Sequence, residues 1–337
     1  MSKLFDTLKL LSEEEMTALS RFMHSPYFVR HSETISLFDY VAPFHPNFEG
    51  DIFEGFIASV SGRKITRARF HVLCTYVLKE VHRFLMVEQL EVRPVVKQGL
   101  LVDRLREKGR YREAQKQAEK MAEAVQRDLY MDSDNFFDQL RLKEVQLDLA
   151  FSAEMEKAPG LLREFLGDLD RHELLLNLKY LLPTWSFSRI FGFDFPQGRW
   201  NRIKAQVVEV GEDWPPLVMM YFHLLHLVKG EEEAEHLPKL QGLLERHAAQ
   251  LSKTELRNIF ANLQNYFTRH VHIGTAGALE QQFRNYQQMD AHNLIFHQGE
   301  MSARFLRNIT MSGCRQGKQA WVAAFLAKHA GTITQTI

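Results

Sequence analysis

The chain has 337 residues with 42 basic and 42 acidic side chains, so its formal net charge is zero. This balance gives no sign of binding to nucleic acid or an anionic membrane through overall charge. Hydrophobic residues make up 45% and charged residues 25%, which is typical of a globular protein and excludes a disordered one. Two distant cysteines and the lack of a long apolar run predict a cytoplasmic protein with no disulfide framework, secretion signal or membrane span.

The first ninety residues predict a helical bundle. Ser12 and Glu15 have the spacing of a capping box at the start of a helix. Two short helices are expected next. Residues 65–90 contain no Gly or Pro, and their apolar residues on more than one side predict a long helix buried between neighbours. We place this bundle at residues 1–92.

The next segment, residues 93–190, predicts helical hairpins. Gly109 allows a sharp turn, Tyr111 fills the gap beside it, and Ala114 lets the second helix approach closely. This Gly-x-Tyr-x-x-Ala spacing resembles the turn between the two helices of a tetratricopeptide (TPR) repeat. Further helices follow in this segment, with a break expected near Pro183.

An irregular segment, residues 191–198, interrupts the helical periodicity and predicts a boundary or a long loop. The remaining residues, 199–337, predict a second array of helical hairpins. A shift of 43 residues superposes three pairs of identical residues: Leu263 and Leu306, Asn265 and Asn308, Gly274 and Gly317. Because helix–glycine turn–helix units at this period are typical of an α-solenoid, we expect an all-α chain with Gly274 and Gly317 in hairpin turns.

Several clusters of residues resemble a family of uncharacterised bacterial proteins with TPR-like helical arrays. They are Leu11-Ser12-Glu13-Glu14-Glu15, Ser25-Pro26-Tyr27-Phe28, the run from Asn265 to Gly274, Phe305, Asn308 and Trp321-Val322-Ala323-Ala324-Phe325. Members of this family usually have Asn after Ser-Pro-Tyr-Phe, where this chain has Val29. The resemblance implies an all-α fold with an interaction role, and it supplies no catalytic residues.

The sequence offers weak candidates for enzymatic or metal chemistry. His223 and His226 are three residues apart on one predicted helix, a spacing that metal ligands use. Their apolar neighbours favour a buried structural pair instead. Glycine-rich phosphate loops and a nucleophile elbow do not occur in the sequence. We therefore expect no catalytic residue, no cofactor and no metal, and an enzyme of unknown class is the second alternative.

A basic stretch from Arg63 to Arg112 raises the alternative of a helical protein that binds nucleic acid. Its candidate anion-binding residues are Arg104, Arg106 and Arg110. These residues alternate by two, which spreads them around a helix instead of lining one face. A solvated flank balanced by acidic neighbours is the preferred interpretation.

The favoured function is a non-catalytic adaptor or scaffold that binds a protein or peptide on a helical-repeat surface. The last helix, near residues 318–329, can direct Trp321 and Phe325 at the preceding hairpin. Val322 and Leu326 are each rotated about 100° from those two and are expected to stay partly uncovered. This end would then either dock a partner, such as a second copy, or continue in a longer natural chain.

Overall fold

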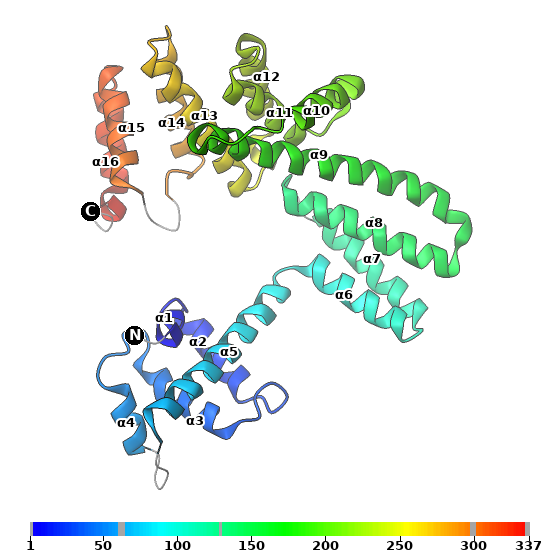
Figure 1. Ribbon diagram of the computed structural model, residues 1–337, viewed down its shortest axis with the longest axis vertical. Helices are drawn as coiled ribbons and strands as arrows, with labels where there is room; N and C mark the ends of the chain where they lie inside the picture. The colour runs from blue at the N-terminus through cyan, green and yellow to red at the C-terminus, as the bar shows by residue number, and fades with distance from the viewer. Residues whose placement is uncertain (1–2, 60–64, 128–129, 297–300, 334–337) are drawn as a thin grey trace. The chain divides into compact units, whose positions relative to one another are not determined.

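The computed structural model describes residues 3–59, 65–127, 130–296 and 301–333 (Figure 1). The described residues form sixteen α-helices and no strand, and the chain is 82% helical, so the all-α prediction is confirmed. Among the described helices, none is both long and apolar enough to cross a membrane. Contacts divide the chain into two compact units, Met1–Lys97 and Gln98–Ile337.

Unit 1 is a bundle built around its longest helix. Its helices are α1 (Lys3–Leu8), α2 (Glu13–Met23), α3 (Ser32–Val41), α4 (Ile52–Ser59) and α5 (Arg67–Glu91). The capping box at the start of α2 is confirmed. The Ser12 hydroxyl accepts a hydrogen bond from the Glu15 backbone N–H at 3.1 Å, and the Glu15 carboxylate accepts one from the Ser12 N–H at 2.7 Å.

Helix α5 packs against α1, α2 and α3 through one face. That face carries Phe70, Leu73, Cys74, Val77, Val81 and Phe84, which are all buried. The expectation that α5 is buried on more than one side is wrong, since Tyr76 is 42% and Met86 is 64% exposed. Tyr76 and Met86 therefore add apolar surface to α5 that no other helix covers among the described residues.

The Ser-Pro-Tyr-Phe motif, residues 25–28, contacts both the end of α2 and the helix α5. The Phe28 ring stacks on Phe22 with their centroids 4.4 Å apart. The Arg83 guanidinium lies 5.0 Å from the centre of the Phe28 ring and donates a hydrogen bond to the Phe28 carbonyl at 3.2 Å. Val29 is buried. These contacts give the motif a structural role in closing the bundle.

Unit 2 is a series of helices, most of which pack on the next helix or the next but one in the chain. They are α6 (Pro94–Glu107), which starts at the boundary, α7 (Tyr111–Arg127), α8 (Ser133–Ala153), α9 (Ala158–Phe191), α10 (Gln197–Val210), α11 (Pro216–Lys229), α12 (Glu233–His247), α13 (Lys253–His272), α14 (Ala278–Ala291), α15 (Ala303–Arg315) and α16 (Gln319–Ile333). Helix α8 packs on α7 and α9, and α11 on α9, α12 and α13; contacts then run from α13 through α14 and α15 to α16 (Figure 1). The irregular segment, residues 191–198, lies inside this unit, and a single core extends across it.

Helix α9 does not break at Pro183 as expected from the sequence. It runs without interruption from Ala158 to Phe191. Proline inside a helix costs about 3 kcal/mol, because it removes one hydrogen bond and crowds the preceding turn. Leu178, Leu181 and Leu182 are buried around the proline in the core of unit 2, and this packing keeps the helix continuous.

Gly109, Gly274 and Gly317 each follow the end of a helix with a positive φ, between 67° and 79°. In each case the glycine N–H donates to the carbonyl three residues back, and the next N–H donates to the carbonyl five residues before itself. This pair of hydrogen bonds is the Schellman motif, which ends a helix in a tight turn. Beside the first turn, Ala114 is fully buried and Tyr111 is half exposed.

Candidate functional site

A buried carboxylate, Glu255, connects four helices of unit 2. Its side chain accepts hydrogen bonds from the Ser133 hydroxyl at 2.7 Å, from the Lys179 ammonium at 2.5 Å and from the Tyr221 hydroxyl. Burial acts to raise the pKa of Glu255, but the hydrogen bonds from Lys179, Tyr221 and Ser133 outweigh it and hold the pKa below its usual range. Ser252 and Glu255 have the spacing of a capping box at the start of α13. The Ser252 hydroxyl does cap α13, whereas both Glu255 oxygens serve this network instead.

The Ser133 backbone N–H also donates to Glu255, at 3.3 Å, so the carboxylate binds both backbone and side-chain groups of other helices. Glu255 and Tyr221 are each 1% exposed. The network therefore stabilises the junction of α8, α9, α11 and α13.

Three histidines meet where α11 is followed by α12. His223, His226 and His236 are each at most 4% exposed. The imidazoles of His226 and His236 stack with their centroids 3.7 Å apart, and the Nδ1 atoms of His223 and His236 are 2.7 Å apart. The carboxylate of Glu232 lies 3.5 Å from His236 Nε2 and 3.8 Å from His226 Nδ1. These groups have the residue types and the proximity to hold a metal ion.

Burial lowers the pKa of each imidazole in this cluster. It brings the pKa of His223 to about 4 and that of His226 to about 3, and the neighbouring His236 contributes in the same direction. The pKa of His236 is also lowered by burial, although Glu232 opposes the change. All three imidazoles are therefore neutral at pH 7, which leaves ring nitrogens free to act as ligands. The buried pair expected from the sequence is present, and it is joined by His236 from the next helix and by Glu232 from the residue just before that helix.

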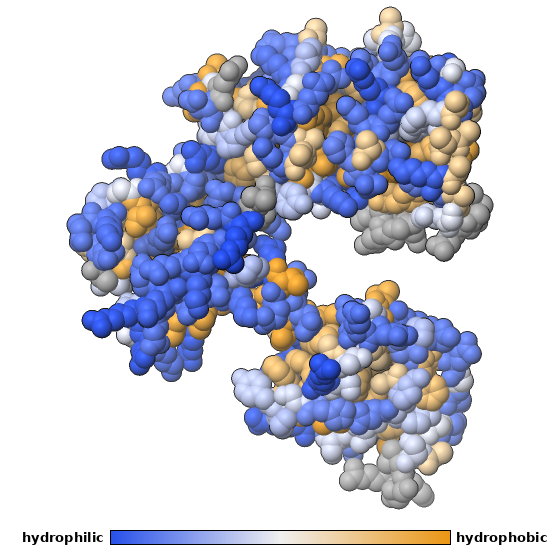
Figure 2. Space-filling model, turned by 180° about the vertical axis from the view of Figure 1, so that it is seen from behind, coloured by the Kyte–Doolittle hydropathy of each residue, from blue (hydrophilic) through white to orange (hydrophobic). Residues whose placement is uncertain are grey.

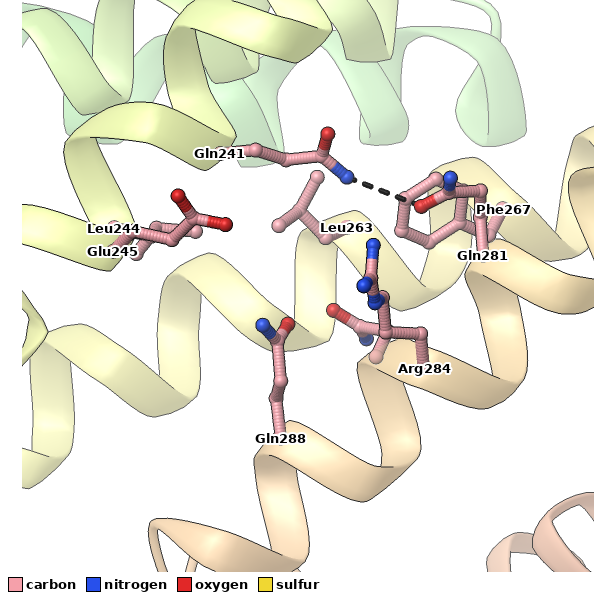
Figure 3. Close-up of a pocket in the computed structure, with 9 residues that line it drawn as sticks. Gln241, Leu244, Glu245, Leu263, Phe267, Gln281, Arg284 and Gln288 are labelled. Carbon is pink, nitrogen blue, oxygen red and sulfur yellow. Dashed lines mark hydrogen bonds between the residues drawn. The ribbon is translucent and has the colours of Figure 1, made fainter.

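A polar groove lies between α12, α13 and α14 (Figure 3). It is lined by Gln241, Leu244, Glu245, Leu263, Phe267, Gln281, Arg284, Asn285 and Gln288. Gln241 and Gln281 point toward one another across it and form a hydrogen bond of 3.2 Å. Amide side chains dominate the lining, which suits hydrogen bonding to a peptide better than acid–base chemistry.

The three candidate anion-binding arginines each contact a carboxylate. Arg104 pairs with Glu107 at 2.6 Å, Arg106 pairs with Asp148 at 2.6 Å, and Arg110 pairs with Glu113. Arg63 and Lys64, at the start of the basic stretch, lie outside the described residues. The neighbouring carboxylates partly neutralise the charges of these arginines, as expected for a solvent-exposed surface with balanced charge. The local contacts therefore do not favour phosphate binding at these arginines.

Helix α16 packs on the preceding helices through a narrow face. Phe325 is 2% exposed, and the Trp321 ring lies 5.1 Å from that of Phe283. Val322, expected to be partly uncovered, is buried, because Gly313 on α15 has no side chain and leaves room for it. Leu326 is 36% exposed, as expected. The other exposed apolar residues of this helix are small: Ala320, Ala323, Ala324, Ala327 and Ala330.

A group of large exposed apolar side chains lies on the second half of α9. Tyr180 is 66%, Phe187 50%, Ile190 69% and Phe191 72% exposed, and we call these four residues the α9 face. Tyr180, Phe187 and Phe191 lie within about 40° of one another around the helix. On the side of the molecule shown in Figure 2, hydrophilic residues predominate and hydrophobic residues are exposed in small groups.

Apolar residues at helical spacing in a sequence usually belong to a core, so the sequence alone does not distinguish this exposed stripe from a buried one. In the structure, the opposite side of α9 supplies the core through Leu174, Leu178 and Leu181, so the α9 face has no described neighbour to cover it. When the chain is compared with protein-family models, with curated proteins and with solved structures, nothing matches.

Proposed function

We propose that this protein is a non-catalytic interaction scaffold, and that the α9 face binds an amphipathic helix of a partner protein. The observation that carries this proposal is the exposure of four large apolar side chains on one helix. Exposed apolar groups of this kind mark interaction sites on soluble proteins. Tyr and Phe are also enriched at the centres of protein interfaces, where they contribute much of the binding energy.

The shape of the α9 face favours a helical partner. Its side chains follow a helical stripe, and an amphipathic helix laid along it would bury apolar residues at similar spacing. Phe187 and Phe191 already lie together, with ring centroids 5.9 Å apart, and present one continuous apolar surface.

One edge of the α9 face carries a basic residue. Arg199 is exposed and lines the same hollow as Tyr180. It donates a hydrogen bond to the Asn177 amide oxygen at 2.8 Å, which holds its guanidinium near the apolar surface. A polar rim around an apolar centre is the usual anatomy of an interface, so the partner helix should carry an acidic residue facing Arg199.

The succession of hairpins in unit 2 supports the same function. Pairs α11–α12, α13–α14 and α15–α16 follow one another, and Gly274 and Gly317 occupy corresponding turns. Series of this kind present extended surfaces made of many modest side chains, which suit proteins and peptides better than small substrates. We extend the proposal to a TPR-like array, with the α9 face as its main binding surface.

The experiment compares partner capture by the wild-type chain and by a triple variant, Phe187→Ser with Ile190→Ser and Phe191→Ser. Truncating an interface anchor costs about 1–2 kcal/mol or more, so three substitutions should weaken binding at least about 100-fold. Val208→Ser is the matched control, because Val208 is an apolar residue that is 75% exposed on another helix, α10.

The readout is recovery of partners from the native cells by affinity capture, followed by the Kd of each purified partner. The wild type and the control should recover the same protein, and the triple variant should lose it. Retention of that partner by the triple variant would contradict the role of the α9 face. Turnover of a small molecule by the pure protein, with no partner recovered, would contradict the scaffold function.

A further inference from the structure

The histidine cluster between α11 and α12 has no part in the partner binding proposed for the α9 face. His226 lies in the last turn of α11 and His236 in the first turns of α12. Glu232, from the connection between these helices, approaches both imidazoles. Three potential ligands therefore come from eleven consecutive residues that fold back on themselves.

Three ring nitrogens of this cluster have no hydrogen-bond partner within the part of the chain that the structure describes. Both nitrogens of His226 and the Nε2 atom of His236 are buried without a hydrogen bond. The ring of His226 is enclosed by Trp200 and Phe222, whose centroids are 4.9 and 4.7 Å away. Buried polar atoms without partners are rare in native proteins and call for a ligand, an ion or a water molecule.

Glu232 is held over the two imidazoles by an unusual backbone. Its φ is 48° and its ψ is 41°, which places a non-glycine residue in the left-handed region. Such strained residues gather at functional sites. The preceding turn reproduces the Schellman pattern at Gly230, whose N–H donates to Leu227 while the Glu231 N–H donates to the His226 carbonyl. The turn therefore fixes the carboxylate and one imidazole in relation to each other.

We propose that His226, Glu232 and His236 bind a divalent transition-metal ion of the Zn²⁺ type. Two imidazole nitrogens and a carboxylate oxygen form a borderline donor set that suits Zn²⁺ and Co²⁺, whereas Mg²⁺ and Ca²⁺ prefer oxygen ligands. The three donor atoms lie within 4.8 Å of one another. An imidazole nitrogen donates in the plane of its ring, and the two rings stack at an angle of 19°. Binding therefore requires one ring to rotate out of the stack, together with a rotation of the exposed Glu232 side chain. Water completes the coordination.

The neighbouring groups assign the ligand atoms. The Nδ1 atom of His236 faces His223 Nδ1 at 2.7 Å, so a proton between them leaves His236 Nε2 free as the ligand. This arrangement, in which the second nitrogen of a ligand imidazole is hydrogen-bonded, is general at metal sites. Glu231 accepts a hydrogen bond from Trp200 at 3.0 Å and pairs with Lys229 at 3.3 Å, so Glu232 is the carboxylate that remains for the metal.

A metal here joins the end of α11 to the start of α12 and stabilises that hairpin. The site is independent of partner binding on the α9 face, and the two proposals can fail separately. The test uses the full-length chain after removal of metal with a chelator. Zn²⁺ is titrated by calorimetry, with Mg²⁺ as the negative arm, and Co²⁺ is followed by its visible absorption. Since Trp200 adjoins His226, bound Co²⁺ should also quench part of the tryptophan fluorescence.

We expect one Zn²⁺ per chain and Co²⁺ bands typical of four ligands. Glu232→Gln should weaken Zn²⁺ binding at least about 10-fold, and His236→Gln should abolish it. Glu232 is exposed, so its substitution tests the proposal even where loss of His236 disturbs folding. Matched controls are Glu235→Gln, in the same helical turn, and His272→Gln, an exposed histidine.

Stoichiometric Zn²⁺ binding that survives both controls and is weakened by Glu232→Gln supports the site. Three results overturn it: no Zn²⁺ binding by the folded chain, binding that Glu232→Gln leaves unchanged, or binding that His272→Gln weakens equally. The triple variant of the α9 face should bind Zn²⁺ as the wild type does. Loss of partner binding with intact Zn²⁺ binding, or the reverse, therefore distinguishes the two proposals.

Discussion

The buried Glu255 network gives the sharpest prediction for stability. Glu255→Gln keeps the size of the side chain but removes its charge. Three donors then face a neutral amide in place of a carboxylate, namely Lys179, Tyr221 and the Ser133 hydroxyl. A hydrogen bond to a charged group contributes about 1 kcal/mol more than one between neutral groups.

Summed over three donors, the free energy of unfolding of unit 2 should fall by about 3 kcal/mol. This value lies at the lower end of the range for breaking a buried ion pair, about 3–5 kcal/mol. For a unit of this size it corresponds to a decrease in Tm of roughly 6–12 °C.

Urea unfolding followed by tryptophan fluorescence measures this change in unit 2 alone. All four tryptophans, Trp185, Trp200, Trp214 and Trp321, lie in that unit. Glu280→Gln is the matched control, because Glu280 is also in the first turn of a helix but is exposed, so it should change stability little. An unchanged midpoint for Glu255→Gln, or an equal loss for both variants, would refute the reasoning.

The same network predicts a dependence on pH. The pKa of Glu255 is lower in the folded protein than the usual value of about 4.3 in an unfolded chain. The unfolded state therefore binds the proton more readily, and stability rises with pH in this range. The contribution is complete above pH 4.3 and is lost as the pH falls through the folded-state pKa. The stability difference between wild type and Glu255→Gln should accordingly shrink below about pH 4.

Three further outcomes are expected. Gly313→Ala should destabilise the packing of α15 by about 1–3 kcal/mol, measured by urea unfolding, since an added Cβ would lie 2.4 Å from Val322 Cγ2; an unchanged midpoint would contradict the close approach of these helices. If α16 pairs with a second copy, light scattering should show a concentration-dependent dimer that Leu326→Glu removes, and a monomer at all concentrations would contradict self-association. Oligonucleotide binding at low salt should be negligible, and joint substitution of Arg104, Arg106 and Arg110 should not change it. Salt-dependent binding that this substitution abolishes would restore the nucleic-acid alternative.

Local sequence signals predicted the helices well, because they depend on residues close in the chain. The capping box at Ser12 and the glycine at Gly109 are examples, since each fixes hydrogen bonds within six residues. The continuity of α9 through Pro183 could not be predicted in this way. The cost of that proline is offset by core contacts with other helices, which the local pattern does not contain.

The candidate sites depend on residues that are distant in sequence or hidden by periodicity. Ser133 and Glu255 are 122 residues apart, and no spacing rule connects them. The spacing of His223 and His226 indicated a pair on one helix. His236 follows His226 by ten residues across a turn, and only the fold brings it and Glu232 to that pair. The apolar residues of the α9 face have the spacing of a core stripe, and their exposure is evident only once the covered side of α9 is known.

Site-specific photo-crosslinking tests the central claim most directly. A photoreactive phenylalanine derivative replaces Phe187 in the α9 face or, as a control, Val208 on α10, and the full-length chain is illuminated in its native cells. The account predicts one discrete crosslinked partner at position 187, attached through an amphipathic helix, and none at position 208. Equal crosslinking at both positions, or no crosslink at position 187 while a partner is captured through another surface, would contradict it.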